Sequence, residues 1–417
     1  MKRLLLLASL ALLSLGLFTT SLAAQEKILR LGVEGPFTGP QAGTGAEFRI
    51  ATEMALEKID YKIGDYKVEV VWIDGLYDPA KATSAYSEAV DKQGIDVGFL
   101  NSASSVSVAL MDLVATYKIP HFFTLGATGV VNQKYHSDPE KYSYWSTKIW
   151  PVPASLMQSY VDVLEAAIAK GDWKPEKKTV ALYGEDTDWG RSACGSMAEL
   201  FKTAGWDVVS TDYFPTTQTD FYSLLNRYRS NKVAVIAGTS NYPALGALIK
   251  QAKEVGLKSV IIADGMGWVG NWYDMVGTAT EGVLDMSPVF TTPQAIDWAK
   301  KFEARAGYKP SPHHAGLPYD GASFLIKVLE RTLAKHGELN KEKIHEVLVS
   351  EVLTGQLTYT EKDGAVTMKA YRYTPESTPD PVVGPDGFFF PVLQYDKEGV
   401  GHIIYPPDVA NSAFKVK

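Results

Sequence analysis

The apolar positions of this chain change period many times, and the changes predict alternating strands and helices. Residues 28–33 and 67–73 are short runs rich in aliphatic side chains, as is typical of strands. Residues 47–59 and 79–92 carry apolar side chains at helical spacing. Strands that alternate with helices in this order predict a parallel sheet with helices on both faces.

The alternation continues to about residue 284, with one interruption. Pro151 and Pro153 break the pattern, which then starts again, so the chain is expected to be α/β with two doubly wound units in succession. Further strands are predicted at 97–100, 119–124, 180–183, 207–213, 233–237 and 260–263. Further helices are predicted at 104–117, 189–203, 221–230, 243–255 and 270–276.

The C-terminal part of the chain has a different pattern. Helices are expected at 293–305, 320–336 and 341–350, and residues 356–373 read as a β-hairpin that turns at residues 361–364. A loop rich in proline, glycine and acidic residues follows. Residues 388–395 and 401–405 alternate like edge strands.

Small, hydroxyl-rich loops follow several of the predicted strands. In doubly wound sheets, ligands lie outside the carboxyl ends of the strands. Exposed N–H groups and short hydroxyls at such turns can hold a small anion such as a carboxylate. The loops at 35–45, 100–105 and 124–129 in the first unit, and at 184–190, 238–243 and 264–268 in the second, are therefore expected to converge on one cleft.

The N-terminus reads as a targeting segment. Lys2 and Arg3 precede an apolar run over residues 4–18, and small residues stand at positions 21 and 23. Residues 1–24 are therefore predicted to be a cleaved signal peptide, because the run is shorter than the ~20 residues of a membrane anchor. No cysteine stands at the predicted cut, so no lipid anchor is expected there. The mature protein is expected to be soluble and to work outside the cytoplasm.

Composition restricts the possible partners. Removal of Lys2 and Arg3 leaves 39 basic and 48 acidic residues, a net charge of −9, which argues against nucleic acid or an anionic membrane surface. A mature chain of roughly 390 residues favours two lobes. Cys194 is the single cysteine, so no intrachain disulfide forms, and we expect it to be a small buried side chain.

Motifs for catalysis, cofactors or metals are absent from the sequence. It contains no HExxH, GxSxG, Walker lysine loop or cysteine–histidine zinc spacing, so we expect no enzyme and no cofactor. The acids Glu185, Asp186 and Asp188 are predicted to cap the helix that follows them. The adjacent His313 and His314 point apart on any regular element, so a surface position is expected instead of a metal site.

The segments 35–48 (GPFTGPQAGTGAEF), 101–128 and 242–256 resemble the periplasmic leucine/isoleucine/valine-binding proteins, the type I solute-binding proteins of ABC importers. The likeness runs from about residue 28 to residue 359. It implies two Rossmann-like lobes joined by a three-segment hinge, with a ligand trapped by hinge closure. The lobes implied are 25–147 plus 285–355, and 148–284 plus 356–417.

The resemblance also implies a ligand site. Ser102 and Thr128 match residues that hold the carboxylate of an amino acid, and the carbonyl of Ala127 matches an ammonium acceptor. Asp264 falls where the family places an acid against the ammonium. Residues expected to line the pocket around the ligand side chain are Thr44, Trp150, Trp189, Asn241, Tyr242 and Trp268.

Each role has a structural alternative. Ser102 and Thr128 could cap helices, and Asp264 could be a turn residue before Gly265. Most of the tryptophans could be core or hinge packing.

Lys148 could be a second contact to an anion.

The expected function is an extracytoplasmic receptor that delivers a small amino acid, branched-chain or related, to an ABC permease, as a monomer. Two alternatives stay open: a receptor for aromatic or aliphatic carboxylates without an amine, and a ligand-sensing module.

Overall fold

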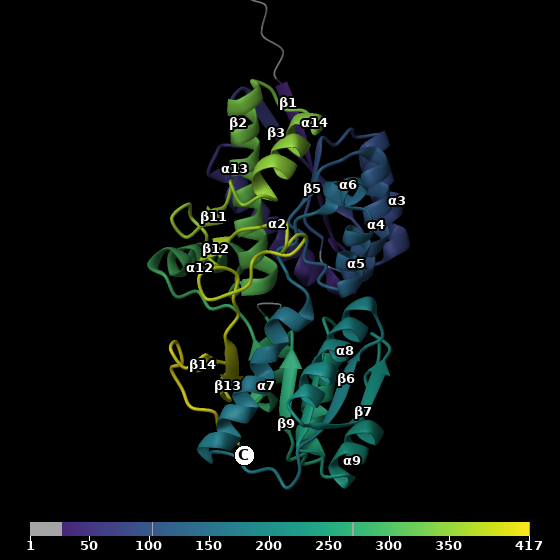
Figure 1. Cartoon of the computed structure of the whole chain (residues 1–417), viewed down its shortest axis with the longest axis vertical. Coiled ribbons are helices and arrows are strands. Elements are labelled where there is room, and N and C mark those ends of the chain that lie inside the picture. The colour runs from purple at the N-terminus through teal and green to yellow at the C-terminus, as the bar shows by residue number, and fades with distance from the viewer. Residues whose placement is uncertain (1–26, 102, 269–270, 417) are drawn as a thin grey trace, which may run out of the picture.

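The computed structural model describes residues 27–101, 103–268 and 271–416. Its strands form two main sheets, one in each of two lobes that lie one above the other in Figure 1. The predicted signal peptide and Ser102 lie outside the described residues. Among the helices of the described ranges, none combines the length and apolar character that a bilayer crossing requires.

The first lobe is built on a five-stranded sheet of order β2-β3-β1-β4-β5. β1 is parallel to both β3 and β4, β4 is parallel to β5, and β2 is antiparallel to β3. The strands are β1 (Lys27–Gly35), β2 (Lys62–Ile63), β3 (Tyr66–Asp74), β4 (Val97–Phe99) and β5 (His121–Phe122). The predicted strand at 119–124 is therefore shorter than expected, and Phe123, with φ of 55°, turns the chain away immediately after β5.

Helices cover both faces of this sheet. α2 packs on α13 on one face, and α3 packs on α4 on the other (Figure 1). The helices of this lobe are α2 (Ala42–Glu57), α3 (Pro79–Asp91), α4 (Ser104–Tyr117), α5 (Gly129–Ser137), α6 (Pro139–Tyr142), α12 (Pro293–Ala306), α13 (Leu317–His336) and α14 (Lys341–Val347).

α2 begins five residues earlier than the sequence predicts, so Thr44 lies in its first turn. Gly45 makes this early start possible, because a Cβ there would lie 2.3 Å from the carbonyl oxygen of Pro36. A residue with a side chain would push the loop after β1 away from the helix. The glycine-rich segment at 35–45 is thus partly helix and only partly loop.

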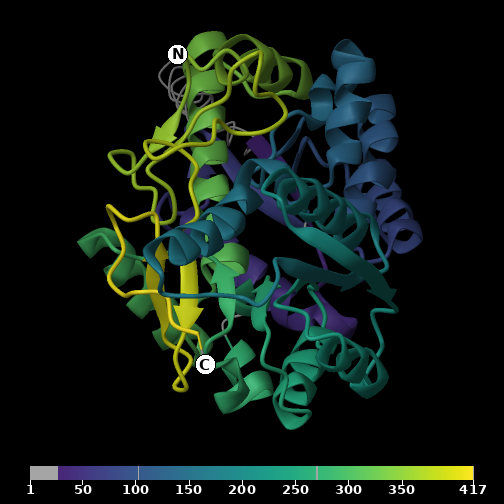
Figure 2. The same ribbon diagram turned by 60° about the horizontal axis from the view of Figure 1, so that its bottom comes forward.

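The second lobe is built on a seven-stranded sheet of order β14-β13-β10-β9-β8-β6-β7. Its strands are β6 (Thr179–Glu185), β7 (Asp207–Phe214), β8 (Val235–Thr239), β9 (Val260–Asp264), β10 (Leu284–Met286), β13 (Val392–Tyr395) and β14 (Gly401–Tyr405). The five neighbouring strands β7, β6, β8, β9 and β10 pair in parallel. β13 and β14, drawn in yellow in Figure 2, extend one edge of the sheet in antiparallel pairing. The helices are α7 (Pro153–Lys170), α8 (Asp188–Thr203), α9 (Tyr222–Ser230), α10 (Ala244–Glu254) and α11 (Trp272–Val276).

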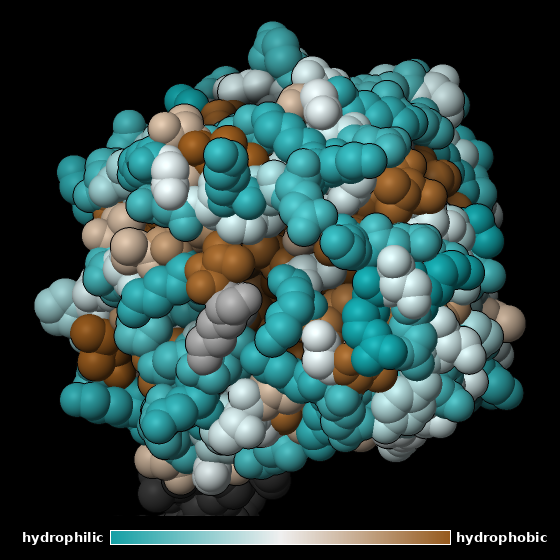
Figure 3. Space-filling model, turned by 90° about the horizontal axis from the view of Figure 1, so that it is seen from below, coloured by the Kyte–Doolittle hydropathy of each residue, from teal (hydrophilic) through white to brown (hydrophobic). Residues whose placement is uncertain are grey.

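Cys194 lies buried in α8, and its Sγ is 3.3 Å from the carbonyl oxygen of Tyr183. The expectation of a small buried side chain is confirmed. Seen from the end of the molecule where the second sheet lies, hydrophilic residues cover most of the surface, and hydrophobic residues gather in patches between them (Figure 3).

The predicted hairpin at 356–373 forms, but the division of the chain at residue 356 does not match its packing. β11 (Tyr359–Thr360) and β12 (Ala370–Tyr371) pair as an antiparallel two-stranded sheet. The backbone N–H groups of Val366 and Thr367 donate to the buried carboxylate of Asp320 in α13, at 2.8 and 2.9 Å. These bonds hold the hairpin against the first lobe, and the chain returns to the second lobe only between β12 and β13.

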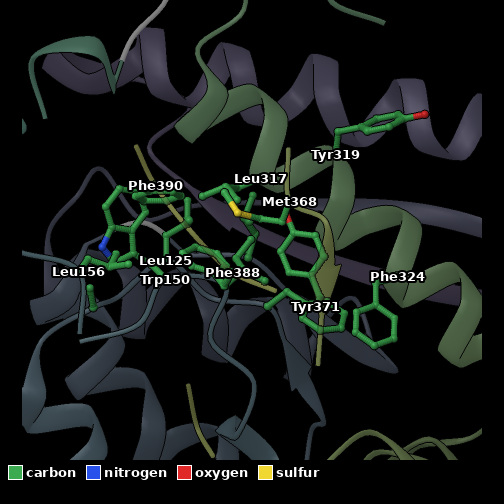
Figure 4. Packing of buried hydrophobic residues seen from close by; sticks show 14 of the residues in the cluster. Leu125, Trp150, Leu156, Leu317, Tyr319, Phe324, Met368, Tyr371, Phe388 and Phe390 are labelled. Atoms are coloured by element: carbon green, nitrogen blue, oxygen red, sulfur yellow. The ribbon is translucent and has the colours of Figure 1, made fainter. Parts of the chain in front are cut away.

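A shared core joins the lobes at the hinge. The chain crosses between the lobes first at residues 146–152, just before α7, and for the third time at residues 372–391, between β12 and β13. Figure 4 shows Trp150 of the first crossing packed beside Leu125 of the first lobe and Phe390 of the third crossing. The ring centroids of Trp150 and Phe390 are 4.8 Å apart. Hydrophobic packing is therefore continuous from one lobe to the other.

Candidate functional site

Loops from both lobes enclose a cavity at the carboxyl ends of the strands. The first lobe contributes residues that follow β4 and β5, and the second contributes residues that follow β6, β8 and β9, some in loops and some in the first turn of a helix. The side chains that line this inter-lobe cavity are Ser104, Leu125, Ala127, Trp150, Trp189, Asn241, Trp268 and His314. Five predicted site residues, Ala127, Trp150, Trp189, Asn241 and Trp268, are thus brought together.

Three tryptophans form most of the apolar wall. The ring centroids of Trp268 lie 5.3 Å from Trp150 and 5.5 Å from Trp189, at tilted angles. The indole N–H of Trp189 donates to Thr239 Oγ1 at 3.0 Å, which fixes that ring. The enclosed free volume is only about 10 Å³, enough for about one water molecule. A ligand of amino-acid size can therefore enter only if the walls move apart.

A wider groove lies beside the cavity and shares Asn241 and Trp268 with it. Its free volume is about 240 Å³. Thr44 and Tyr242, both predicted from the sequence to line the ligand pocket, line this groove and not the cavity. We refer to it below as the mouth groove.

Direct contacts hold the lobes together across the cleft. Gln41 Nε2 of the first lobe donates to the carbonyl oxygen of Asn241 at 2.9 Å, and Asn241 Nδ2 donates to Tyr77 Oη at 3.3 Å. On the other side of the cleft, the N–H of Gly129 donates to Ser192 Oγ at 3.2 Å. The structure therefore shows the two lobes in a closed arrangement.

A buried acid positions the loop that carries Asn241. Glu185 Oε2 accepts hydrogen bonds from the N–H of Asn241 and from Ser240 Oγ, at 2.8 and 2.9 Å. The prediction that Glu185 caps α8 is wrong: Thr187 is the N-cap, with its Oγ1 accepting from the N–H of Gly190. Burial raises the pKa of Glu185.

Thr128 lies beside the cavity without lining it. Its Oγ1 accepts from the N–H of Val130 at 3.3 Å, so Thr128 is the N-cap of α5, the structural alternative considered above. Its own N–H donates to Ser104 Oγ at 3.2 Å. Ser104 begins α4, and the N-cap residue Ala103 offers no side-chain cap. The amino-terminal end of α4, which carries Ser104, therefore lies at the cavity, and helix N–H groups at such an end favour an anion.

Asp264 points into the second lobe and is not among the residues that line the cavity. Its Oδ1 accepts from Tyr160 Oη at 2.8 Å, and the residue is 1% exposed. Burial and, next, the nearby Asp285 raise its pKa to about 8. Asp285 itself accepts from the N–H groups of Gly265 and Gly267. This pair of acids holds the turn after β9.

The histidine pair is buried, so the predicted surface position is wrong. Ser311 Oγ accepts from the N–H groups of both His313 and His314 at the start of a π-helical turn, η5 (Pro312–Gly316), and this cap turns the pair inward. His313 packs on Trp150 with centroids 4.8 Å apart. His314 lines the cavity and its Nδ1 lies 3.2 Å from Thr44 Oγ1. Burial lowers the pKa of His314 to about 3, so its ring is neutral at physiological pH.

His314, Leu125 and Ser104 are the lining residues that the sequence analysis did not select. Ser104 and Leu125 lie within the loops at 100–105 and 124–129, which the sequence analysis expected at the cleft, so their position in these loops could have identified them. No local pattern predicted His314, because it reaches the cavity from a segment more than 100 residues away in the chain from the lining residues Ser104 and Leu125.

Lys148 does not face the cavity, which contradicts its suggested role as an anion contact. The side chain is fully buried, and its Nζ lies 2.7 Å from Asp380 Oδ1 and 2.8 Å from Asn132 Oδ1. It therefore neutralises an acid of the third crossing segment. Within residues 27–101, 103–268 and 271–416, no three acids, histidines or cysteines gather closely enough to hold a metal ion.

Comparisons with known proteins agree on one family. A sequence profile described as "Periplasmic binding protein" matches residues 28–378. The Leu/Ile/Val-binding protein homolog 8 of Brucella abortus is 26% identical over 345 residues, which cover 79% of this chain and 82% of the relative.

Two solved structures show the same fold. The branched-chain amino acid transporter substrate binding protein LivJ of Streptococcus pneumoniae, in complex with isoleucine, superposes with a TM-score of 0.67 at 16% identity, over 91% of this chain and all of that one. A solute binding protein of an ABC transporter from Rhodopseudomonas palustris, in complex with 3,4-dihydroxybenzoic acid, gives 0.70 at 18% identity, over 90% and 96% of the two chains.

Proposed function

Because the chain belongs to the periplasmic binding protein family, we propose that it is the periplasmic receptor of an ABC importer for a small carboxylate with a flat apolar body. A solute-binding protein of this kind holds its ligand and does not convert it. The mature protein works as a monomer that presents the closed, ligand-bound form to a membrane permease.

The lining of the cavity is the observation that carries the choice of ligand. Its walls are mainly tryptophan, its polar side chains are those of Ser104, Asn241 and His314, and the indole N–H of Trp268 is buried without a hydrogen-bond partner among the described residues. No carboxylate lines it among the described residues, and none of the internal residues outside them, Ser102, Val269 and Gly270, is acidic. An ammonium group in this cavity would lose its hydration without gaining an opposite charge, which is costly.

The two ends of such a ligand fit the two sides of the cavity. The amino-terminal end of α4 and Ser104 attract a carboxylate, because helix N–H groups and the helix dipole favour negative charge there. Ser102, which the sequence places just before this helix, is part of the same proposal. The three indole rings pack on an aromatic or aliphatic body.

A branched-chain amino acid is the second candidate. Relatives named as Leu/Ile/Val-binding proteins favour it, and so does Asp264, whose Oδ2 is buried and has no hydrogen-bond partner among the described residues. In this case Asp264 would have to turn from Tyr160 toward the ligand, or the indole faces would hold the ammonium by cation–π contacts.

Titration calorimetry with matched ligands separates the two candidates. We expect 3-phenylpropionate to bind at least about 10-fold more tightly than phenylalanine, which differs from it by the amine alone. The reason is that the ammonium group loses its hydration in the cavity and meets no carboxylate there. 4-Hydroxybenzoate and isoleucine form the second comparison. Tighter binding of phenylalanine and isoleucine would reverse the assignment in favour of the amino acid.

The contacts across the cleft give a separate prediction about closure. Tyr77→Phe removes the hydroxyl that accepts from Asn241 Nδ2 in the closed form and leaves the cavity lining unchanged. Ligand binding is expected to weaken by about 2- to 10-fold, the worth of one hydrogen bond. The matched control is Tyr117→Phe, whose hydroxyl donates to Asp91 within the first lobe. Equal affinity in all three proteins would mean that the Tyr77 contact contributes nothing to closure.

A further inference from the structure

Most of the free volume in the cleft lies outside the tryptophan walls. The cavity holds about 10 Å³, whereas the mouth groove that shares Asn241 and Trp268 with it holds about 240 Å³. A ligand that occupies both spaces would pass between these two side chains. The groove is therefore a continuation of the ligand site toward solvent.

Among the described residues, no charged side chain lines the mouth groove. The first lobe contributes Gln41 and Thr44 on α2 and the turn before it, and the second lobe contributes the start of α10 and the segment around α11. The apolar residues of the groove include Leu245, Met266, Trp268, Trp272, Met275 and Val276. A charged group here would lose hydration without meeting an opposite charge, so the walls favour a neutral group.

Two helices begin at this groove without a side-chain cap. The N-cap residues are Gln41 for α2 and Pro243 for α10, and neither side chain accepts from its own helix. Several of their first N–H groups already have partners, because the N–H of Ala42 donates to the carbonyl oxygen of Gly39 and that of Leu245 to the carbonyl oxygen of Tyr242. The indole N–H of Trp268, which also lines the groove, is buried and has no hydrogen-bond partner among the described residues. The groove thus combines apolar walls with a donor that a ligand can use.

We propose that the ligand has two parts: a carboxylate head with a flat body in the cavity, and a neutral tail that accepts hydrogen bonds, such as an amide or ester, in the mouth groove. The head assignment rests on the proposed function, and the tail assignment rests on the groove. The natural ligand is then longer than benzoate or isoleucine.

Gly246 offers a direct way to fill the groove. It lines the groove on α10, and a Cβ there would make ordinary contacts with Val276 and Met275, at 3.5 and 3.8 Å. A Cβ at position 246 therefore fits without displacing backbone, so Gly246→Ala is a small step into the tail space and Gly246→Leu is designed to fill more of it. Gly195→Leu on α8 is the matched control, because a Cβ at this exposed helical glycine meets nothing within 4 Å.

The test is calorimetric titration of the full mature protein with benzoate, 4-acetamidobenzoate and terephthalate. The wild type is expected to bind 4-acetamidobenzoate at least about 10-fold more tightly than benzoate, and terephthalate, whose tail is charged, less tightly than either. Gly246→Leu is expected to remove the advantage of the acetamido tail and to leave benzoate affinity within about 2-fold, with Gly246→Ala between the two. Gly195→Leu is expected to behave as the wild type.

The outcomes separate the two proposals. Binding of benzoate with no gain from the acetamido group, or an equal loss of both ligands in Gly246→Leu, overturns the tail subsite and leaves the proposed function standing. Failure of all three carboxylates to bind overturns the carboxylate head and the two-part ligand together.

Discussion

Replacement of Lys148 with methionine is expected to lower the free energy of unfolding by about 3–5 kcal/mol, the largest effect of any single substitution proposed for this protein. The Lys148 ammonium is fully buried against the carboxylate of Asp380, 2.7 Å away. Methionine keeps the length of the side chain but leaves the Asp380 charge without its partner. A buried charge without a counter-ion is far more costly than a lost surface pair.

The position of this ion pair explains why its loss would also weaken the neighbouring contacts between the two crossing segments. Lys148 N donates to the carbonyl oxygen of Pro379 at 2.8 Å, and Tyr373 Oη donates to the carbonyl oxygen of Lys148 at 2.6 Å. Asp380 Oδ2 accepts from the N–H of Val152 at 2.9 Å. The pair therefore fastens the first crossing between the lobes to the third.

Urea denaturation followed by circular dichroism measures the effect. The control is Lys232→Met, which breaks an exposed pair with Glu176 at 3.5 Å and is expected to change the unfolding free energy by less than about 0.5 kcal/mol. The double variant Lys148→Met/Asp380→Leu is expected to recover much of the loss, because it removes both charges. A single Lys148→Met variant as stable as the wild type would show that the pair contributes no net stability.

The stability of the protein is expected to fall by about 3 kcal/mol between pH 7 and pH 9, and Asp264→Asn is expected to remove roughly half of this fall. Burial is the main reason why the pKa of Asp264 rises to about 8, and burial likewise raises the pKa of Glu34 to about 8. In the unfolded chain both groups ionise near pH 4. Their stabilising effect is therefore complete below pH 4 and is lost as the pH rises through about 8.

Titration of the buried histidines does not contribute to the change in stability between pH 7 and pH 9. Burial lowers the pKa of His121 and of His314 to about 3, so these groups reduce stability only where the unfolded chain takes up protons, below about pH 6.5. Asparagine at position 264 still accepts from Tyr160 and does not titrate. The measurement is a series of urea denaturation curves from pH 7 to 9. Identical pH profiles for wild type and Asp264→Asn would mean that Asp264 is ionised in the folded protein at pH 7.

Local sequence patterns predicted much of the site because the carboxyl ends of the parallel strands in each sheet lie at one edge. The loops after β5, β6, β8 and β9 each delivered at least one predicted residue to the cavity or the groove. Ala127 and Trp189 are examples: each lies within a few residues of the carboxyl end of its strand, β5 or β6, so its position required only the strand and the direction of the sheet. Thr128 and Asp264 lie at the right strand ends but turn to caps and partners inside their own lobes.

The sequence by itself predicted most of the strands and helices, although not α7 or β10, and it predicted the two-lobed α/β fold and the strand ends at which the cleft lies, because periodicity and strand-end loops are local properties of the chain. Only the tertiary structure decided that His314 enters the cavity, that Lys148 meets Asp380, and that the hairpin joins the first lobe. Each of these depends on contacts between segments far apart in the chain, such as the 232 positions between Lys148 and Asp380. Which polar group becomes the partner of another is decided by the packing that buries them both, and no local pattern records it.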